Sequence, residues 1–304
     1  MGERCCVYSV LMGGYEMLVE QPVAESSDVD FVLFTDDRGV TSESWQIRHE
    51  EPVLPQDPTR SSRRPKILPH VVLPEYDVSI YVDNRVVLRQ DPQTIVDRLL
   101  PDDSVLAINA HDERETVRDE FEVVMRWGLD ARWVCCEQLE HYESWRPDTL
   151  GRRPLWSGFM VRRHNDPVLI RANEIWWTQL LRYSRRDQLS FVLALAEAGL
   201  EPTIHHLPGR GSELHEWLHP SDVGRIDSRR GKLPVVPELV ECQARAREQA
   251  RRAAMELDEA QQRLAKAQTS VALLRESRQE VLDSMSWRLT GPLRWLADRV
   301  RGLS

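Results

Sequence analysis

One apolar run of the sequence ends in charged side chains: Ser79-Ile80-Tyr81-Val82-Asp83-Asn84-Arg85. Alternation along a strand places Asp83 and Arg85 on one side and Asn84 on the other. A carboxylate beside a guanidinium can hold a diphosphate, either through a divalent metal ion on Asp83 or through bidentate contacts from Arg85. The run therefore predicts an anion site at a strand end, although an acidic residue in such a place is often only structural.

Polar groups also follow two earlier runs. Thr35 and Asp36 end the run 30–34 with groups suited to ribose or base-edge hydrogen bonds, although turn chemistry explains them equally well. Gly13 and Gly14 follow the first run and could let the backbone approach a nucleotide, which is weak evidence by itself.

Two predicted helices begin with concentrated charge. Arg63 and Lys66 belong to a basic cluster, where helix N–H groups also favour anions; a solvated surface is the alternative. Asp187 lies between Arg186 and Gln188, shortly before an apolar run, and could cap a helix or belong to a site.

A pair of histidines follows the last predicted strand. His205 and His206 face opposite ways on a strand, so at most one is expected to reach a pocket, and a lone histidine is more often structural than a ligand. The sequence contains no Gly-x-Ser-x-Gly elbow, P-loop, His-Glu-x-x-His or kinase motif set.

Short β-branched runs alternate with helical patterns over the first 210 residues or so, which predicts an α/β domain with a largely parallel sheet. Ligand sites in such folds lie beyond the carboxyl ends of the strands. The expected strands are Cys5–Leu11, Asp30–Phe34, Val78–Val82, Val105–Ile108, Trp156–Val161 and Thr203–His205. The expected helices are Arg64–Leu73, Thr94–Leu100, Arg114–Trp127, Pro167–Arg182 and Asp187–Ala198.

Composition excludes several classes. The 304 residues are 41% apolar with a net charge of -9, which suits a globular core and disfavours generic nucleic-acid binding. Five cysteines, two adjacent pairs and Cys242, lack metal-binding or disulfide spacing. Because the sequence shows neither a run of about 18 apolar residues nor a secretory signal pattern, we expect a cytoplasmic protein.

The C-terminal third changes character. We expect a catalytic-type domain over 1–218, a linker over 219–240, a long helix or coiled coil over 241–283 and a cationic amphipathic tail over 284–304. Alanine-rich core positions predict modest self-association, with packing on the globular domain as the alternative. The tail, which contains Trp287, Trp295 and several arginines, suits an anionic membrane surface at the inner face of the cell membrane, or docks on the protein's own body.

An ordered series of motifs resembles a known family. The series resembles the glycosyltransferase-like family, formerly a domain of unknown function, that includes plant mucilage-related proteins and a reported plant alkaline ceramidase. The likeness covers about residues 5–210. Its motifs are Val7-Tyr8-Ser9-Val10 through Gly13-Gly14-Tyr15, Asp30 to Asp36, Lys66-Ile67-Leu68-Pro69-His70, Tyr81-Val82-Asp83-Asn84, His111 with Arg114 and Glu120, and Arg186-Asp187-Gln188-Leu189-Ser190-Phe191.

The resemblance implies a GT-A-like (Rossmann-like) transferase related to glycogenin, which uses a nucleotide-diphosphate sugar and Mn²⁺ or Mg²⁺. Asp83 matches the first aspartate of Asp-x-Asp and His206 the late metal-binding histidine, but Arg85 replaces the second aspartate, which puts metal dependence in doubt. The roles that it implies for the remaining residues are catalytic for Asp187, Gln188 and Arg186, and donor-binding for Thr35, Asp36, Arg63, Lys66, Arg85, His111 and Arg114. Trp156 is the best candidate to stack on a sugar.

The expected function is transfer of a sugar to a bacterial surface glycan or glycolipid. The C-terminal Ser-Trp-Arg-Leu-Thr-Gly-Pro-Leu-Arg string, similar to tails of bacterial glycosyltransferases, favours this class. The alternatives are a non-catalytic nucleotide-sugar-binding or scaffold protein, and a ceramidase-like lipid amidohydrolase.

Overall fold

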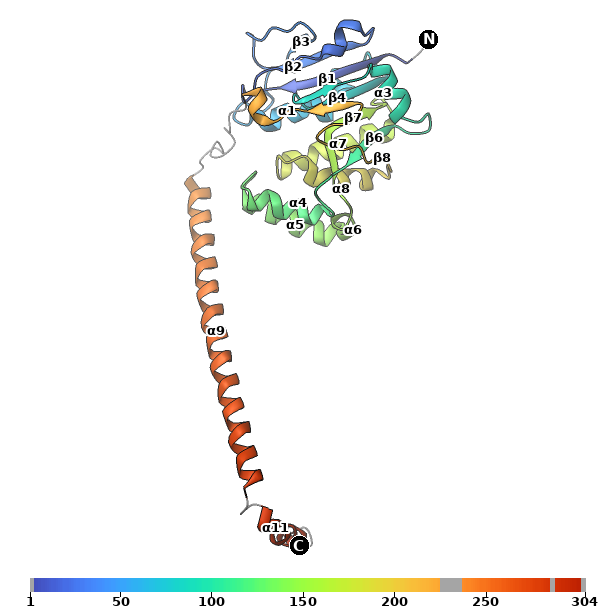
Figure 1. Ribbon diagram of the computed structural model, residues 1–304. Coiled ribbons are helices and arrows are strands. Elements are labelled where there is room, and N and C mark those ends of the chain that lie inside the picture. The colour runs from blue at the N-terminus through green and yellow to red at the C-terminus, as the bar shows by residue number, and fades with distance from the viewer. Residues whose placement is uncertain (1–2, 225–236, 285–287, 302–304) are drawn as a thin grey trace. The chain divides into compact units, whose positions relative to one another are not determined.

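The computed structural model describes residues 3–224, 237–284 and 288–301. The chain divides into two compact units, Met1–Pro234 and Val235–Ser304, and each is described by itself (Figure 1). The first unit contains the sheet and all the predicted site residues.

The first unit is built on a seven-stranded sheet in the order β3-β2-β1-β4-β7-β6-β8. All of these strands run in one direction except β7, which is antiparallel to β4 and β6. The prediction of an α/β domain with a mostly parallel sheet is therefore confirmed. The strands are β1 (Cys5–Leu11), β2 (Asp30–Thr35), β3 (Gln46–His49), β4 (Val78–Val82), β6 (Leu106–Ala110), β7 (Leu155–Arg162) and β8 (Thr203–His205), and a separate ribbon pairs β5 (Val86–Leu88) with β9 (His215–Trp217).

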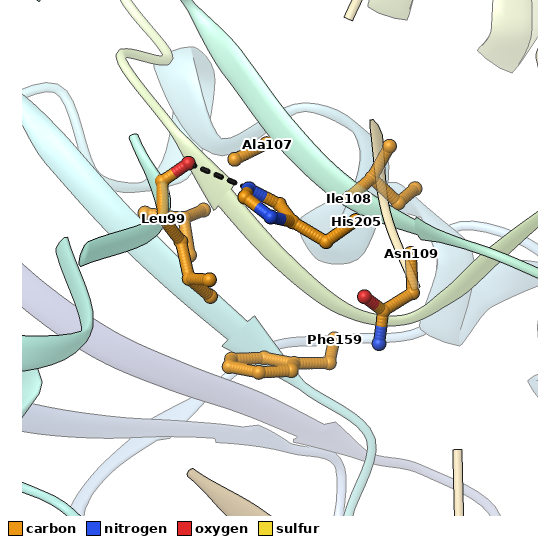
Figure 2. A pocket seen from close by; sticks show the side chains of 7 residues that line it. Leu99, Ala107, Ile108, Asn109, Phe159 and His205 are labelled. Carbon is orange, nitrogen blue, oxygen red and sulfur yellow. Dashed lines mark hydrogen bonds between the residues drawn. The ribbon is translucent and has the colours of Figure 1, made fainter. Parts of the chain in front are cut away.

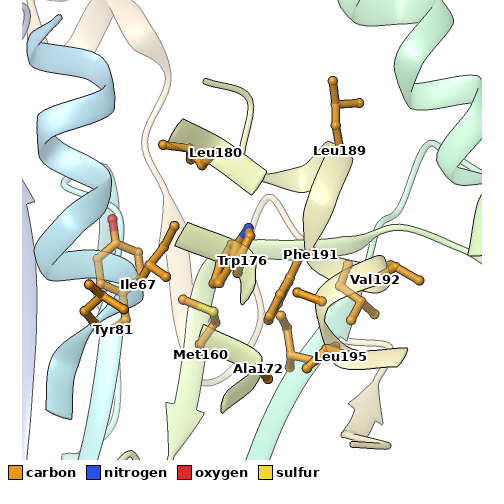
Figure 3. Packing of buried hydrophobic residues seen from close by; sticks show 14 of the residues in the cluster. Ile67, Tyr81, Met160, Ala172, Trp176, Leu180, Leu189, Phe191, Val192 and Leu195 are labelled. Atoms are coloured by element: carbon orange, nitrogen blue, oxygen red, sulfur yellow. The ribbon is translucent and has the colours of Figure 1, made fainter. Parts of the chain in front are cut away.

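Both faces of the sheet are covered. Because side chains alternate along a strand, Tyr8 and Tyr81 join the core on one face and Val7 and Ile80 the core on the other. The first core packs α1, α4, α5, α6, α7 and α8, with Trp176 stacked on Phe191 at 3.8 Å between ring centroids (Figure 3). Helix α3 packs against the second core. The helices are α1 (Pro58–Ile67), α2 (Pro69–Val72), α3 (Pro92–Leu99), α4 (Val117–Arg126), α5 (Arg132–Trp145), α6 (Pro147–Leu150), α7 (Pro167–Arg182) and α8 (Gln188–Ala198), with 3₁₀ turns η1 (Pro22–Ser26) and η2 (Pro220–Val223).

The helix predicted over 64–73 lies elsewhere. Helix α1 begins six residues earlier, because the Asp57 carboxylate accepts from the Arg60 N–H and Pro58 occupies the first turn. It ends at Ile67, since Pro69 has no N–H to continue the ladder. Arg63 and Lys66 therefore lie in the second half of the helix and not at its start.

The second unit contains α9 (Pro237–Asp283) and α11 (Gly291–Arg301). The predicted long C-terminal helix is confirmed, and it begins four residues before the predicted 241. Trp287 and Leu303 of the predicted tail lie outside the described residues, as do the side chains of Cys242, Ala246 and Ala250. Within the described part of the chain, no helix combines the length and apolarity needed to cross a membrane.

A buried histidine makes the fold sensitive to acid. His164 is fully buried and its ring nitrogens lie 2.9 Å from Ser79 Oγ and 3.1 Å from the Leu73 carbonyl oxygen. Burial lowers the pKa of His164 to about 4. Since the unfolded chain takes up this proton near pH 6.5, the contribution of neutral His164 is present above pH 6.5 and is lost as the pH falls towards 4.

We expect this one group to lower the free energy of unfolding by about 3 kcal/mol between pH 7 and 4. Urea unfolding of wild type and of His164→Gln across this pH range measures the contribution of His164 to the loss of stability. The variant should lack that contribution. His219→Gln, at an exposed histidine, is the control and should keep the wild-type slope. Equal slopes in wild type and His164→Gln would contradict the prediction.

Candidate functional site

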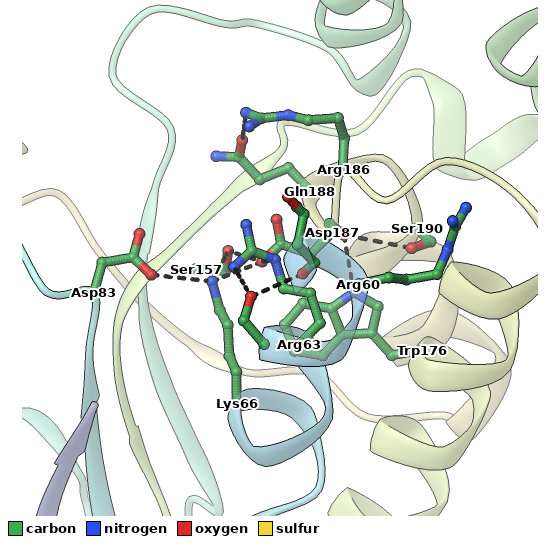
Figure 4. A network of polar contacts seen from close by, with 12 residues as sticks. Arg60, Arg63, Lys66, Asp83, Ser157, Trp176, Arg186, Asp187, Gln188 and Ser190 are labelled. Atoms are coloured by element: carbon green, nitrogen blue, oxygen red, sulfur yellow. Dashed lines mark hydrogen bonds and ion pairs between the residues drawn. The ribbon is translucent and has the colours of Figure 1, made fainter. Parts of the chain in front are cut away.

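The site is centred on Asp187, whose carboxylate is held by three side chains (Figure 4). Its Oδ2 atom lies 2.6 Å from Lys66 Nζ, 3.5 Å from Arg63 Nε and 3.0 Å from Ser157 Oγ. The side chains of Lys66 and Asp187 are only 2% and 4% exposed. The alternative role as a helix cap is not seen, since this side chain makes no cap hydrogen bond to helix α8.

Three elements bring these groups together. Arg63 and Lys66 lie one turn apart on α1, so they share a helix face. Because β7 runs against its neighbours, its beginning lies where β4 ends, and the Asp83 N–H donates to the Gly158 carbonyl at 2.8 Å. Ser157 therefore lies at the carboxyl edge of the parallel strands, where the sequence predicted the site.

Asp83 is the solvent-facing carboxylate of this cluster. Its Oδ1 atom accepts from the Tyr81 hydroxyl at 2.7 Å and lies 3.4 Å from Lys66 Nζ, and its side chain is 40% exposed. Both contacts engage Oδ1, which leaves Oδ2 available to a ligand. Lys66 thus joins a buried carboxylate, Asp187, to an accessible one.

The charges of the cluster balance. Burial raises the pKa of Asp187, but Arg63 and Lys66 outweigh burial and hold this pKa well below its usual range. The same two cations lower the pKa of Asp83 against the opposing effect of burial. Asp83 and Asp187 are therefore both ionised at neutral pH, and they face Lys66 and Arg63.

The backbone of Asp187 is held by residues that the sequence did not single out. The Trp176 indole N–H donates to the Asp187 carbonyl at 2.8 Å. Asp130 accepts from the Ser184 hydroxyl at 2.7 Å and from the Arg185 N–H at 2.8 Å, which fixes the loop before Asp187. Only the crowding of charge in this loop pointed to it.

A second ionic group extends from the neighbouring residues. Arg186 Nη2 donates to Gln188 Oε1 at 3.2 Å and lies 4.0 Å from Glu120 Oε1, and Arg114 Nε lies 3.2 Å from Glu120 Oε2. Burial raises the pKa of Glu120, although Arg186 and Arg114 oppose it. Burial and then Arg114 lower the pKa of His111. The structure therefore joins four of the predicted site residues in one network, namely Arg114, Glu120, Arg186 and Gln188.

Thr35 and Asp36 lie at the predicted strand end. The Asp36 carboxylate accepts from the Gly13 N–H at 3.0 and 3.1 Å, and Thr35 Oγ1 accepts from the Asp37 N–H at 3.1 Å. Both side chains thus organise the loops after β1 and β2.

Gly13 has no room for a side chain. Its φ is +81°, and a Cβ atom would lie 2.7 Å from Pro58 Cβ. We expect Gly13→Ala to lower the free energy of unfolding by about 2 kcal/mol, measured by urea unfolding. Gly14→Ala is the control: at φ +55° with open space around it, it should cost only about 1 kcal/mol. Equal losses would contradict the steric argument.

Among the described residues, the contacts that hold the Asp187 cluster together involve neither Arg85 nor His206. The Arg85 guanidinium packs over the Trp217 ring at 4.6 Å and donates to the Leu218 carbonyl at 3.0 Å, because β5 pairs with β9. His206 is exposed in the loop after β8. Trp156, the predicted sugar-stacking residue, is buried against Trp217 at 5.6 Å between ring centroids.

The metal prediction can be compared with the donor atoms present. The described ranges contain no group of three or more His, Cys, Asp or Glu side chains arranged to hold an ion. Mg²⁺ in nucleotide sites often takes only one or two carboxylates and completes its shell with phosphates and water. Asp83, whose Oδ2 atom is available, therefore fits a metal ion that binds together with the diphosphate of a nucleotide. It does not fit an ion that the protein side chains hold by themselves.

A small cavity lies away from this cluster, between β6, β7 and the end of α3 (Figure 2). Its lining includes Phe159, Asn109 and His205, whose Nε2 lies 2.8 Å from the Leu99 carbonyl oxygen. Its size admits about one water molecule, so it is too small for a nucleotide or a sugar.

Comparison with known proteins places the domain. The family model of the TOD1/MUCI70 glycosyltransferase-like domain matches residues 10–204. The chain belongs to this family. The TOD1/MUCI70 domain therefore includes the Asp187 cluster and the Arg114–Glu120–Arg186 network, whereas His206 lies two residues beyond the match.

Individual relatives are more distant. A probable hexosyltransferase, MUCI70 of Arabidopsis thaliana, is 28% identical over 154 residues, which cover 48% of this chain; the chain spans about a quarter of that protein's length (26%). Among solved structures, the WbbM bifunctional glycosyltransferase matches 68% of this chain and 39% of its own with a TM-score of 0.38 and 12% identity. Mouse xyloside xylosyltransferase 1 matches over 66% of this chain and 84% of its own chain, with a TM-score of 0.37 and 12% identity.

Proposed function

We propose that this TOD1/MUCI70 domain is a GT-A-like glycosyltransferase that moves a sugar from a nucleoside diphosphate to a glycan or glycolipid acceptor. The observation that carries the proposal is the buried ionic cluster of Asp187, Lys66 and Arg63 under the accessible Asp83, at the carboxyl edge of the sheet. Family membership supports the reaction class.

The reaction requires little covalent chemistry from the protein itself. The bond from the sugar anomeric carbon to the diphosphate oxygen breaks, a bond to an acceptor oxygen forms, and the acceptor hydroxyl loses its proton. The main requirement is to stabilise negative charge on the departing diphosphate. A divalent ion bound with the donor at Asp83 would neutralise part of that charge.

Different residues of the chain serve different parts of this reaction. Lys66 and Arg63 place fixed positive charge beside Asp83, where the diphosphate would bind. Asp187 holds both cations in place, and Gln188, oriented by Arg186, is available to hydrogen-bond the sugar or acceptor. Thr35 and Asp36 lie at the loops expected to meet the nucleoside.

Nucleotide binding tests the proposal. UDP, GDP and ADP at millimolar concentration, each with and without Mn²⁺, should include at least one that raises the melting temperature by several degrees, since a ligand at 100 times its Kd adds about 2.7 kcal/mol. The matching nucleotide sugar should then be hydrolysed slowly. If none of these nucleotides shifts the melting temperature, the transferase proposal is wrong.

Binding without turnover would favour the non-catalytic alternative. The specific observation behind that alternative is Arg85, which stands where relatives of this fold class are expected to have a second aspartate and which packs on Trp217. Release of fatty acid from a ceramide, with no nucleotide effect, would instead favour the lipid amidohydrolase.

We further propose that the acceptor is a bacterial surface glycan or glycolipid at the inner face of the cell membrane, reached through α11. Leu293, Trp295, Leu296 and Val300 are all exposed on this helix, which also carries Arg294, Arg299 and Arg301. Deletion of 285–304 should abolish flotation with vesicles of 30% anionic lipid while nucleotide binding stays intact. Unchanged flotation would contradict the membrane proposal.

Helix α9 supports a proposed self-association. Its described apolar positions Leu257, Leu264, Val271 and Leu274 follow heptad spacing and are all exposed. Sedimentation should show a weak dimer that Leu264→Asp dissociates, whereas Gln262→Asp, two residues away, should leave it intact. A monomer at all concentrations would contradict this proposal.

A further inference from the structure

Arg162, in β7, is a fully buried cation that forms no carboxylate ion pair among the described residues. Its Nη2 atom donates to the Tyr8 hydroxyl and, at 3.0 Å, to the Lys66 carbonyl oxygen. Its Nε and Nη1 atoms find no hydrogen-bond partner within the part of the chain that the structure describes. Because burying an unpaired charge is unfavourable, this arginine is retained at a cost to stability.

The contacts of Arg162 converge on the end of helix α1. The Lys66 carbonyl is one of the last four of this helix, which have no partner inside it. It accepts from the Tyr8 hydroxyl at 2.9 Å and from Arg162 at 3.0 Å. A cation at a helix C-terminus also interacts favourably with the helix dipole.

The same residue carries the ammonium at the centre of the site. Lys66 Nζ lies 2.6 Å from Asp187, 3.1 Å from Ser157 Oγ and 3.4 Å from Asp83. The carbonyl group that Arg162 and Tyr8 hold is bonded to the Lys66 Cα atom, from which the side chain extends. Lys66 is therefore fixed at both ends, and a shift at the carbonyl end would move the ammonium.

We propose that Arg162 is a positioning residue for Lys66: together with Tyr8 it fixes the Lys66 carbonyl so that the ammonium lies between Asp83 and Asp187. The functional part of this inference rests on the proposed nucleotide-sugar function. The structural part, the anchoring of the end of α1, does not.

Arg162→Met separates these effects. The substitution leaves the Lys66 carbonyl with the Tyr8 hydroxyl, so no polar group loses its last partner and the melting temperature should not fall. The Kd for the nucleoside diphosphate that binds wild type among UDP, GDP and ADP should rise about tenfold. Arg162→Lys, which can still donate to one of the two oxygens, should recover part of the affinity.

A double-mutant cycle tests the route through Lys66. Arg162→Met should change the Kd by less than twofold in a Lys66→Met background, since the ammonium to be positioned is absent. Arg163→Met is the matched control: Arg163 is the next residue, pairs with Glu3 at the surface and should leave the Kd unchanged. Equal effects of Arg162→Met in both backgrounds, or wild-type affinity in Arg162→Met, would overturn the inference.

Hydrogen exchange gives a readout that does not depend on any nucleotide. Amides of Arg64 and of residues 66–68 should exchange about tenfold faster in Arg162→Met than in wild type, and not in Arg163→Met. Unchanged exchange at the end of α1 would overturn the anchoring role itself. A wild type that binds none of the nucleotides contradicts the proposed function, and the exchange experiment still decides the anchoring.

Discussion

Replacing Asp187 by asparagine should lower sugar transfer at least about a thousandfold. The neutral amide removes the buried charge that holds Lys66 and Arg63, so both cations lose their closest partner. Because Asp83 still lies beside Lys66, the variant keeps one uncompensated cation in the site, which should also lower the free energy of unfolding by about 3–5 kcal/mol. Donor turnover and urea unfolding measure the two effects.

The two effects can be separated by a second variant. Adding Lys66→Met to Asp187→Asn removes one unpaired cation and should return much of the lost stability without returning activity. Glu197→Gln is the matched control, because Glu197 is also a partly buried carboxylate paired with an arginine, Arg146, and contributes no contact to the Asp187 cluster. It should reduce stability while nucleotide binding survives. A stable, fully active Asp187→Asn protein would contradict the assignment.

Lys66→Met should weaken nucleoside diphosphate binding about a hundredfold. Without the ammonium, Asp83 and Asp187 share only Arg63, and their negative charge opposes the diphosphate. Calorimetric titration of both proteins measures the loss. Lys66→Arg keeps the charge with a different shape and should bind with intermediate affinity.

The pH dependence of the Lys66→Met protein gives a second test. In wild type the pKa values of Asp83 and Asp187 are both lowered, so nucleotide affinity should change little between pH 8 and 5. Loss of the ammonium should raise the pKa of one carboxylate of the pair. Protonation then relieves repulsion, so the affinity of the variant should increase as the pH falls. A flat profile in the variant would contradict the proposed coupling.

Much of this domain was predictable from local patterns. The strand 5–11 was placed with its true bounds because an apolar run there is followed by Gly13 and Gly14. Asp83 was placed at a carboxyl edge because strand 78–82 is a short, continuous apolar run. The order of strands and helices then predicted where the polar groups would gather.

The rest depended on contacts between distant segments. Arg85 packs over Trp217 because β5 pairs with β9, 127 to 131 residues further on, and no local pattern indicated this pairing. The reversed direction of β7, which delivers Ser157, has no signature in its own residues. Lys66 was predicted to bind the donor, with a solvated surface as the alternative, but no local pattern indicated that it is buried, since its partner carboxylate comes from a loop 121 residues away. Short segments such as β3 and β9 carry too few residues for a period to be recognised.

A structure of the protein in complex with UDP, or with whichever nucleoside diphosphate raises its melting temperature, tests the central claim most directly. The account predicts that the diphosphate lies at the carboxyl edge of the sheet, within contact distance of Asp83 or of a metal ion on it and beside Lys66 and Arg63. A diphosphate bound elsewhere, with the Asp187 cluster closed and free of ligand contacts, would contradict it.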